Sequence, residues 1–347
     1  MHLAPVLGPR ARWWLLPWVL AVATLANLAY PMYVHYDFSH SLDSRSYLHM
    51  ATGQFDSTRV THRYRVLVPA AAAVLAMPIT QVYAHVWPQR PADYWPLRFS
   101  FYLVNCVLLA AAGACWCNAA RLTGASQAAA LLAMLAVLTS RWAEYAAGLP
   151  LTDSLYLLVI GLSYYAIRRG SGAGWALALA LLVGPLAKES FLLLVPWLCW
   201  FGRPALSWPR QAFALTTGLL ALAAVHHFID FRTGAPAAAS VSNALGHLTN
   251  LQYSAHRAFS AKGLGELLSI FGLFSLLLPA AYWLEEKKIK GPRWFSAFGW
   301  AEASLLVIVV AHMALSGDLG RMGYLAAPVF CVALALVFTH SRRLLRI

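Results

Sequence analysis

The sequence predicts an all-α polytopic integral membrane protein, and three features of its composition support this fold class. Of the 347 residues, 60% are hydrophobic and only 11% are charged, whereas an ordinary soluble domain has about 25% charged residues. The mean hydropathy is +0.60. The hydrophobic residues gather in long runs, as membrane spans require. Together these features exclude a disordered chain, a coiled coil and a typical cytosolic enzyme.

The apolar runs predict about 10–11 transmembrane helices, because one span needs about 20 apolar residues. We expect them to form a single integral membrane domain over residues 1–347. The runs lie at residues 13–34, 66–87, 97–117, 127–139, 149–167, 175–186, 191–201, 212–229, 264–284, 295–315 and 323–339. Two long polar segments interrupt them, a first outer loop at 35–65 and a second at 230–263. Both exceed the usual loop length, which favours function or helices of their own.

The basic residues predict the orientation. The net charge is +13, and most Lys and Arg residues flank apolar runs, as in Arg168-Arg169, so the positive-inside rule explains them better than nucleic-acid binding does. This orientation suits a bacterial inner membrane with the site facing the periplasm; an endoplasmic reticulum protein with a lumenal site is the alternative. A cytoplasmic N-terminus puts the 35–65 loop outside, and three full crossings after it would put Asp153 inside, whereas the basic residues of the later runs predict Asp153 outside. One run between 66 and 139 therefore does not cross fully, either 66–87 or 127–139.

The first outer loop contains the candidate catalytic acids. From Asp43 the spacing is helical, with Tyr47 and Ala51 on the same side. We expect a short amphipathic helix with the Asp43 carboxylate at its N-terminal end, where the helix dipole favours negative charge. Ordinary N-capping explains the same pattern. Asp37, earlier in the loop, is the rival candidate, and Asp56 is interpreted as a solvated loop acid.

Further charged residues lie where later runs begin or break. Asp153 opens a run, Lys188 and Glu189 interrupt one, and Asp318 and Arg321 precede the last. Ionisable groups at membrane depth are costly and indicate functional sites. Because these groups come from separate runs and are all expected on the outer side, we predict one shared cavity. Local ion pairs, Lys188 with Glu189 and Asp318 with Arg321, are the alternative.

His226, His227 and Asp230 end another run at the outer side. His226 and Asp230 are four residues apart and share a helix face, which suits a metal ion or an acceptor group. No third ligand is defined by spacing, and interfacial polar residues would look the same. Metal ligands therefore stay unassigned, and a divalent metal ion is left open as a cofactor.

The stretch Asp43-Ser-Arg-Ser-Tyr-Leu-His-Met-Ala-Thr-Gly53 resembles the first outer loop of the GT-C fold membrane glycosyltransferase superfamily. Its members include the lipid A aminoarabinose transferases and the protein O-mannosyltransferases. The Thr152-Asp153 pair and Ala187-Lys188, where relatives often have Thr-Lys-Gly, resemble later elements of the same superfamily in order and spacing. Two departures are that Ser44 stands where many relatives have a second acid, and that the chain ends in a short basic tail instead of a large soluble domain.

The resemblance implies an inverting transfer of a sugar from a polyprenyl-phosphate donor to an acceptor hydroxyl of a lipid, glycan or protein. Asp43 would be the general base, with Asp153 orienting the acceptor or the base and Asp37 as the rival base. Four cations would bind the donor phosphate: Arg63, Arg65, Lys188 and Arg321. The acceptor or cavity residues would be Tyr47, Glu189, Asp318, His226 and His227. The 230–263 loop would cover the cavity.

Two other functions compete with this interpretation. A transporter or flippase of lipid-linked sugars or other amphiphiles should show paired broken helices in related halves, and the sequence shows one break, at residues 184–190. A non-catalytic scaffold would have no reason to gather Asp43, Asp153, Lys188 and Arg321 on one side.

Overall fold

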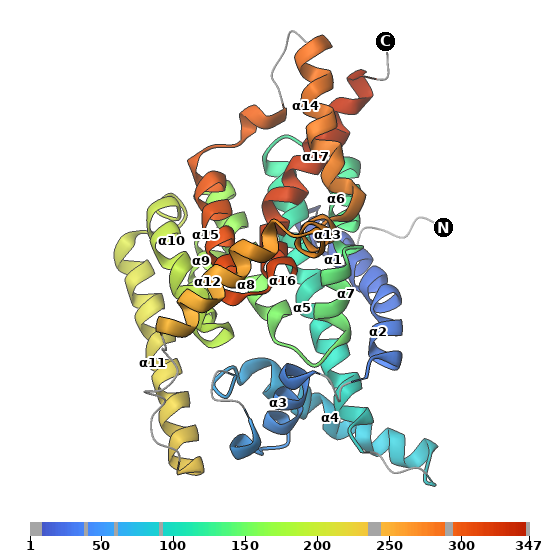
Figure 1. Ribbon diagram of the computed structural model, residues 1–347, viewed down its shortest axis with the longest axis vertical. Helices are drawn as coiled ribbons and strands as arrows, with labels where there is room; N and C mark the ends of the chain where they lie inside the picture. The colour runs from blue at the N-terminus through green and yellow to red at the C-terminus, as the bar shows by residue number, and fades with distance from the viewer. Residues whose placement is uncertain are drawn as a thin grey trace.

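The computed structural model describes residues 9–37, 41–58, 62–89, 93–234, 244–288 and 294–344 (Figure 1). Over these ranges the chain forms α-helices, short 3-10 helices and turns, with no strand, which confirms the all-α prediction for them. Parts of both long polar segments, residues 38–40, 59–61 and 235–243, lie outside the described residues. So do several basic residues expected in the cytoplasm, among them Lys290, Arg293 and Arg346.

The helices follow one another along the chain and are connected by short turns. The α-helices are α1 Pro9–Leu28, α2 Tyr30–His35, α3 Leu42–Ala51, α4 Leu67–Val86, α5 Trp95–Leu122, α6 Gln127–Leu138, α7 Arg141–Gly148, α8 Asp153–Arg169, α9 Gly174–Ala187, α10 Val195–Phe201, α11 Trp208–Thr233, α12 Ala244–Ala258, α13 Ala261–Ser269, α14 Leu277–Lys288, α15 Trp300–Ser316, α16 Leu319–Gly323 and α17 Ala327–Leu344. The 3-10 helices are η2 Phe55–Ser57, η3 Glu189–Leu194, η4 Gly272–Leu276, η5 Trp294–Ala297 and η6 Tyr324–Ala326.

Several helices are long and apolar enough to cross a membrane, as an integral membrane protein requires. Among the described residues there are 5 by length and composition, or up to 6 if a pair bent by 91° counts as one span. They are Trp13–His35, Leu67–Val86, Trp95–Leu122, Trp208–Thr233 and Leu319–His340, with the bent pair Ala261–Ser269 and Gly272–Leu284. The larger number of 10–11 spans depends on shorter helices and stays a prediction.

Helices α1 and α5 run antiparallel. Near the end of α5, the Asn118 side chain donates to the Trp13 carbonyl at 3.3 Å, and near its start Arg98 donates to the Tyr33 carbonyl at 2.8 Å. The segment between Tyr33 and Arg98, including all of α4, therefore leaves and re-enters the bundle at the same end. Of the two runs considered, the 66–87 run is thus the one that does not carry the chain from one end to the other.

Helices α6 and α7 then return the chain to the end of the bundle where Tyr33 and Arg98 meet, here called the near end. At the far end, the Ser126 backbone N–H donates to Thr339 Oγ1 at 3.1 Å. At the near end, Gly148 packs so closely on Ala29 and Met32 that a Cβ would lie 2.7 Å from the Met32 Cβ. The next helix, α8, consequently begins at the end of the bundle where the first loop lies, which places Asp153 beside that loop.

The core is centred on α5 and α8, which contact each other over much of their length. A Cβ on Gly161 would lie 3.4 Å from the Ala112 Cα and 3.0 Å from the Trp116 indole nitrogen. Small residues let the backbones of two apolar helices approach, which strengthens their van der Waals packing. Trp116, Tyr156 and Tyr164 are fully buried around this contact, so α8 is a rigid support for the residues at its ends.

The second polar segment is largely helical where it is described. Helix α11 continues to Thr233, beyond the expected limit of its apolar run, and α12 and α13 follow. Ser260 begins α13 by accepting a hydrogen bond from the Gly263 backbone N–H at 3.1 Å. The segment is therefore built mainly from two short helices rather than from irregular loop.

Candidate functional site

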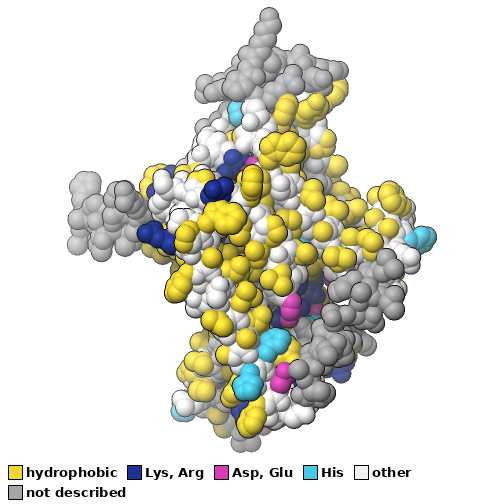
Figure 2. All heavy atoms as spheres, turned by 90° about the vertical axis from the view of Figure 1, so that its left-hand side faces the viewer, with side chains coloured by type: hydrophobic (Ala, Val, Ile, Leu, Met, Phe, Trp, Pro, Cys, Tyr) yellow, Lys and Arg dark blue, Asp and Glu magenta, His cyan; other side chains and the backbone are white. Residues whose placement is uncertain are grey.

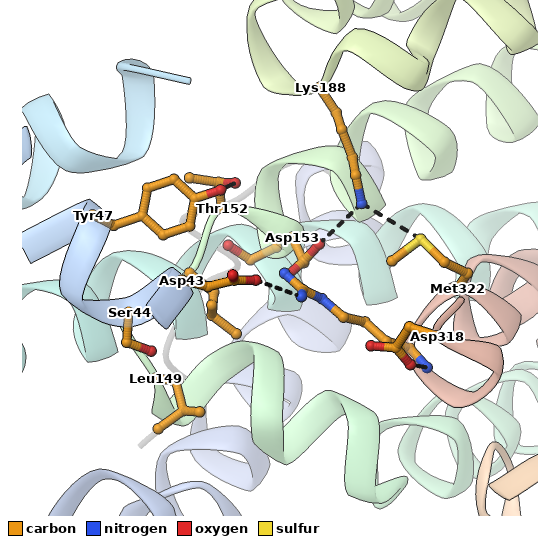
Figure 3. A network of polar contacts seen from close by, with 12 residues as sticks. Asp43, Ser44, Tyr47, Leu149, Thr152, Asp153, Lys188, Asp318 and Met322 are labelled. Atoms are coloured by element: carbon orange, nitrogen blue, oxygen red, sulfur yellow. Dashed lines mark hydrogen bonds and ion pairs between the residues drawn. The ribbon is translucent and has the colours of Figure 1, made fainter. Parts of the chain in front are cut away.

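Side chains from four separate segments meet in one ion-pair network at the end of the bundle where the first loop lies (Figure 3). Arg321 Nη1 donates to Asp43 Oδ2 at 2.9 Å, and Arg321 Nε donates to Asp153 Oδ2 at 2.9 Å. Lys188 Nζ lies 3.5 Å from the other Asp153 oxygen. One guanidinium thus joins two carboxylates that belong to α3 and α8. We call Asp43, Asp153, Lys188 and Arg321 the Asp43–Arg321 network.

Asp43 is placed by the short helix that its spacing predicts. This helix forms as α3, and Asp43 lies in its first turn. The N-cap is Ser41, whose side chain accepts a hydrogen bond from the Ser44 backbone N–H at 3.3 Å, so Asp43 itself is not the cap. Tyr47, one turn later, is fully buried. Capping is therefore the role of Ser41, which leaves the Asp43 carboxylate available to Arg321.

Arg321 is positioned by its neighbours in α16. Asp318 is the N-cap of this helix and accepts from the Arg321 backbone N–H at 3.0 Å. A Cβ on Gly320 would overlap the Trp142 ring, so α16 lies directly against that ring. Asp318 therefore orients the turn that carries Arg321, while the Arg321 guanidinium binds other acids.

Asp153 and Lys188 come from the start of α8 and from a break after α9. Asn105 Nδ2 donates to the carbonyls of Leu149 and Leu151, at 2.9 and 3.2 Å, and thereby holds the turn before Asp153. Lys188 is extended, with φ −166° and ψ 137°, between α9 and η3. This break points the lysine toward Asp153 and toward Met322 Sδ, which lies 3.5 Å from Nζ (Figure 3).

A second group of polar contacts adjoins the network. Arg65 Nη2 donates to Glu189 Oε2 at 2.8 Å, and Arg65 Nη1 donates to the Tyr47 hydroxyl at 3.0 Å. The Tyr47 hydroxyl also accepts from Thr152 Oγ1 at 3.3 Å. Because Thr152 precedes Asp153, this group ties α3 and the end of the first loop to the start of α8.

The charges of the two groups balance. Asp43 and Asp153 face Arg321 and Lys188, and Glu189 faces Arg65. Burial raises the pKa of the Asp43 carboxyl, but Arg321 and His62 oppose this and hold the pKa below its usual value. Burial lowers the pKa of Lys188 to about 8, although Asp153 favours its charged form. The Asp43 carboxyl therefore stays ionised to lower pH than an ordinary aspartate, and Lys188 loses its proton at a lower pH than an ordinary lysine.

The structure separates some of the predicted site residues from this network. Arg63 Nη2 donates to the Thr58 carbonyl of its own loop at 3.4 Å. Asp37 is exposed, two residues after α2, and His227 is exposed on α11. The alternative of local pairs does not hold for Lys188 with Glu189, since each has a partner distant in sequence.

Three contacts of the first loop, made by His62 and Tyr64, were missed by sequence reasoning. His62 Nε2 lies 3.6 Å from Asp43 Oδ1. The Tyr64 ring stacks on His226 with 3.4 Å between the centroids, and the Tyr64 hydroxyl donates to Asp230 at 2.8 Å. The sequence did show that His226 and Asp230 share a helix face. It did not show that Tyr64 of the first loop contacts both of them.

On one face of the molecule, charged side chains gather within a largely apolar surface (Figure 2). Lys, Arg, Asp and Glu side chains lie together in a recess there, with histidines below it. Among the described residues, no group of three or more His, Cys, Asp or Glu side chains is arranged to hold a metal ion.

No model of a known protein family, no curated protein and no solved structure matches this chain. Two carboxylates and two cations, from segments up to 278 positions apart, are held together where apolar helices end. Such a set can bind an anionic group through its cations and accept a proton on a carboxylate.

Proposed function

We propose that this chain is a membrane glycosyltransferase of the GT-C kind, which transfers a sugar from a polyprenyl-phosphate donor to an acceptor hydroxyl with inversion. The observation that carries the proposal is the Asp43–Arg321 ion pair. It joins a carboxylate that can serve as base to a guanidinium that can bind a phosphate, at the end of a bundle of apolar helices. We further propose that this end faces the periplasm of a bacterial inner membrane.

Charge balance determines how the donor is bound. Each cation of the network already faces a carboxylate, so an incoming phosphate must compete for them. Arg321 suits this competition, because its fork of N–H donors matches phosphate oxygens as well as carboxylate oxygens. Lys188 would add a point charge. Binding of the donor would thus draw Arg321 away from Asp43.

Release from Arg321 would convert Asp43 into a better base. The neighbouring guanidinium lowers the pKa of this carboxyl, so its departure raises the affinity of Asp43 for a proton. The acceptor hydroxyl then gives its proton to Asp43 while its oxygen forms a bond to the anomeric carbon. The bond from that carbon to the phosphate oxygen breaks, and polyprenyl phosphate leaves with the electron pair. Arg321 and Lys188 stabilise the charge on the leaving group.

The neighbouring residues would position the reactants. Asp153 is 9% exposed and holds both Arg321 and Lys188, so we assign it a positioning role. Tyr47 and Glu189 fix Arg65 beside the network. The Tyr64 contact with α11 would hold the first loop over the site while the acceptor binds.

A transporter or flippase of lipid-linked sugars or other amphiphiles is the second candidate, and two interrupted helices favour it. The chain has a break between α9 and η3, and also the bent pair Ala261–Ser269 and Gly272–Leu284. Transporters build substrate sites from such interrupted helices. Against this candidate, the charged network lies where helices begin or end, rather than midway along them.

The test is transfer from a panel of radiolabelled polyprenyl-phosphate sugars by the full chain in proteoliposomes. We expect one donor to be consumed and its label to appear on an acceptor supplied as a crude glycan and lipid extract. A parallel measurement follows the movement of the same donor between leaflets without chemical change. Movement without consumption would favour the transporter, and neither movement nor consumption of any donor would contradict both candidates.

A further inference from the structure

A cavity of about 420 Å³ lies at the end of the bundle opposite the Asp43–Arg321 network. It is lined by residues from the start of α1, the end of α5, the end of α8 and the start of α9. Helix α8 relates the two sites, since Asp153 is its first residue and Arg169, which lines the cavity, is its last. Its 17 residues span about 25 Å, close to the roughly 30 Å of a bilayer's hydrocarbon core.

The cavity is cationic. Arg121 and Arg169 line it, and none of its described lining residues is acidic. Within the described residues neither arginine forms an ion pair with a carboxylate, whereas the adjacent Arg168 pairs with Glu302 at 2.9 Å. Arg121 is held in place, because its guanidinium lies 3.4 Å from the centroid of the Trp13 ring. Two guanidiniums that lack an acidic partner among the described residues suit an anionic group.

The rest of the lining suits a lipid. Trp13, Trp14 and Trp175 line the cavity together with Tyr165, and tryptophans of this kind are typical of the boundary between lipid and water. Trp175 is exposed, as are Leu179 and Leu182. These three residues share one face of α9, so an apolar strip continues from the cavity along the helix.

We propose that this cavity binds the phosphate headgroup of an anionic phospholipid. Arg121 and Arg169 contact the phosphate, the indoles pack around the glycerol region, and an acyl chain follows the strip formed by Trp175, Leu179 and Leu182. Basic pockets between membrane helices are known to bind such headgroups. The volume lies within the range of about 300–1,000 Å³ that is usual for small-ligand sites. This site is separate from the proposed catalytic one and does not depend on it.

The experiment titrates the detergent-solubilised full chain with three short-chain or soluble compounds and measures the dissociation constant of each. Phosphatidylglycerol carries a net negative headgroup, phosphatidylcholine has the same tails and a zwitterionic headgroup, and glycerol phosphate has the phosphate without tails. We expect phosphatidylglycerol to bind most tightly and saturably. The doubly substituted variant Arg121→Gln/Arg169→Gln should bind it about tenfold or more weakly, since charge-assisted contacts are lost.

Two controls separate lost binding from lost folding. Arg210→Gln removes one positive charge from the exposed start of α11, outside the cavity, and should leave binding unchanged. Arg121→Lys/Arg169→Lys keeps the charge and should bind better than the Gln variant. Equal binding of phosphatidylglycerol and phosphatidylcholine by the unsubstituted chain would overturn the proposal without any variant. Equal binding of glycerol phosphate and phosphatidylglycerol would instead assign the cavity to a soluble phosphate compound.

Discussion

Arg321 donates a hydrogen bond to the Asp43 carboxylate at 2.9 Å, although 278 positions separate the two residues. The same guanidinium binds Asp153. The first loop, the start of α8 and the turn before α17 are therefore linked through one side chain. Because Arg321 is 15% exposed and Asp153 9%, the link lies in a partly desolvated environment, where a lost counter-charge is costly.

The first prediction concerns the stability supplied by this link. We expect Arg321→Gln to lower the free energy of unfolding by about 3 kcal/mol, because Asp43 and the buried Asp153 both lose their guanidinium partner and Lys188 alone still faces Asp153. Adding Asp153→Asn removes one of those charges, so the double variant should lose less than the sum of the two single losses. The free energy of unfolding is measured in mixed detergent micelles for the original chain, both single variants and the double variant. Additive losses would show that the two side chains are not coupled.

The second prediction concerns pH. Burial lowers the pKa of Lys188 from 10.5 to about 8, so above pH 8 the lysine loses the charge that the donor phosphate requires. The value of kcat/KM should fall as pH rises through about 8. Lys188→Arg should move this fall to higher pH, since arginine stays protonated. A profile that is the same in both proteins would exclude Lys188 as its origin.

Raising the pH above 8 should lower activity but should increase the contribution of Lys188 to stability. Between pH 8 and the ordinary lysine pKa of 10.5, the folded protein has released a proton that the unfolded chain retains. The contribution of Lys188 to stability therefore rises with pH over this interval. The free energy of unfolding at pH 8 and at pH 10, measured for the original protein and for Lys188→Met, tests this sign. The same pH dependence in both proteins would contradict it.

The third prediction concerns the contact between the first loop and α11. Tyr64→Phe removes the hydrogen bond to Asp230 but keeps the ring that stacks on His226. We expect a stability loss of about 1 kcal/mol and faster proteolysis of the first loop. Tyr253→Phe, in α12, is a matched substitution away from this contact. Equal proteolysis of the two variants would argue against a role for Tyr64 in holding the loop.

The fourth prediction tests the close approach of α16 to Trp142. A Cβ at Gly320 would overlap the Trp142 ring, so Gly320→Ala must displace the turn that carries Arg321. We expect a loss of about 1–3 kcal/mol, as for other overpacked sites. Gly265→Ala is the control, because nothing lies within 4 Å of a Cβ at that helical position. Equal stability of the two variants would show that α16 adjusts without cost.

Sequence reasoning predicted the local features of the site well. Helical spacing from Asp43 predicted α3, and the charged pair Lys188-Glu189 within an apolar run indicated the break at Lys188. These features depend on residues close in sequence, where periodicity and helix-breaking residues act directly. The length of the polar segment at 230–263 favoured either function or helices of its own, and helices form in its described part.

Partner choice could not be predicted in the same way. Nothing near Lys188 in the sequence indicates Asp153 rather than Glu189, because the choice depends on how α8 and η3 pack. The antiparallel arrangement of α1 and α5 depends on contacts such as Asn118 with Trp13, which hydropathy does not reveal. The run at 66–87 is apolar enough to span, and only the contact between Arg98 and Tyr33 shows that the chain leaves and re-enters the bundle at the same end around this run.

The most direct test of the account is a single-turnover measurement of sugar transfer with Asp43→Asn, using the donor identified in proteoliposomes. We expect the rate of the chemical step to fall by about 10²–10⁴, while binding of the donor persists because Arg321 and Lys188 remain. Asp56→Asn, an exposed acid of the same loop, should transfer at the original rate, as should Asp37→Asn. A folded Asp43→Asn protein that transfers sugar as fast as the original chain would contradict the assignment of Asp43 as the base.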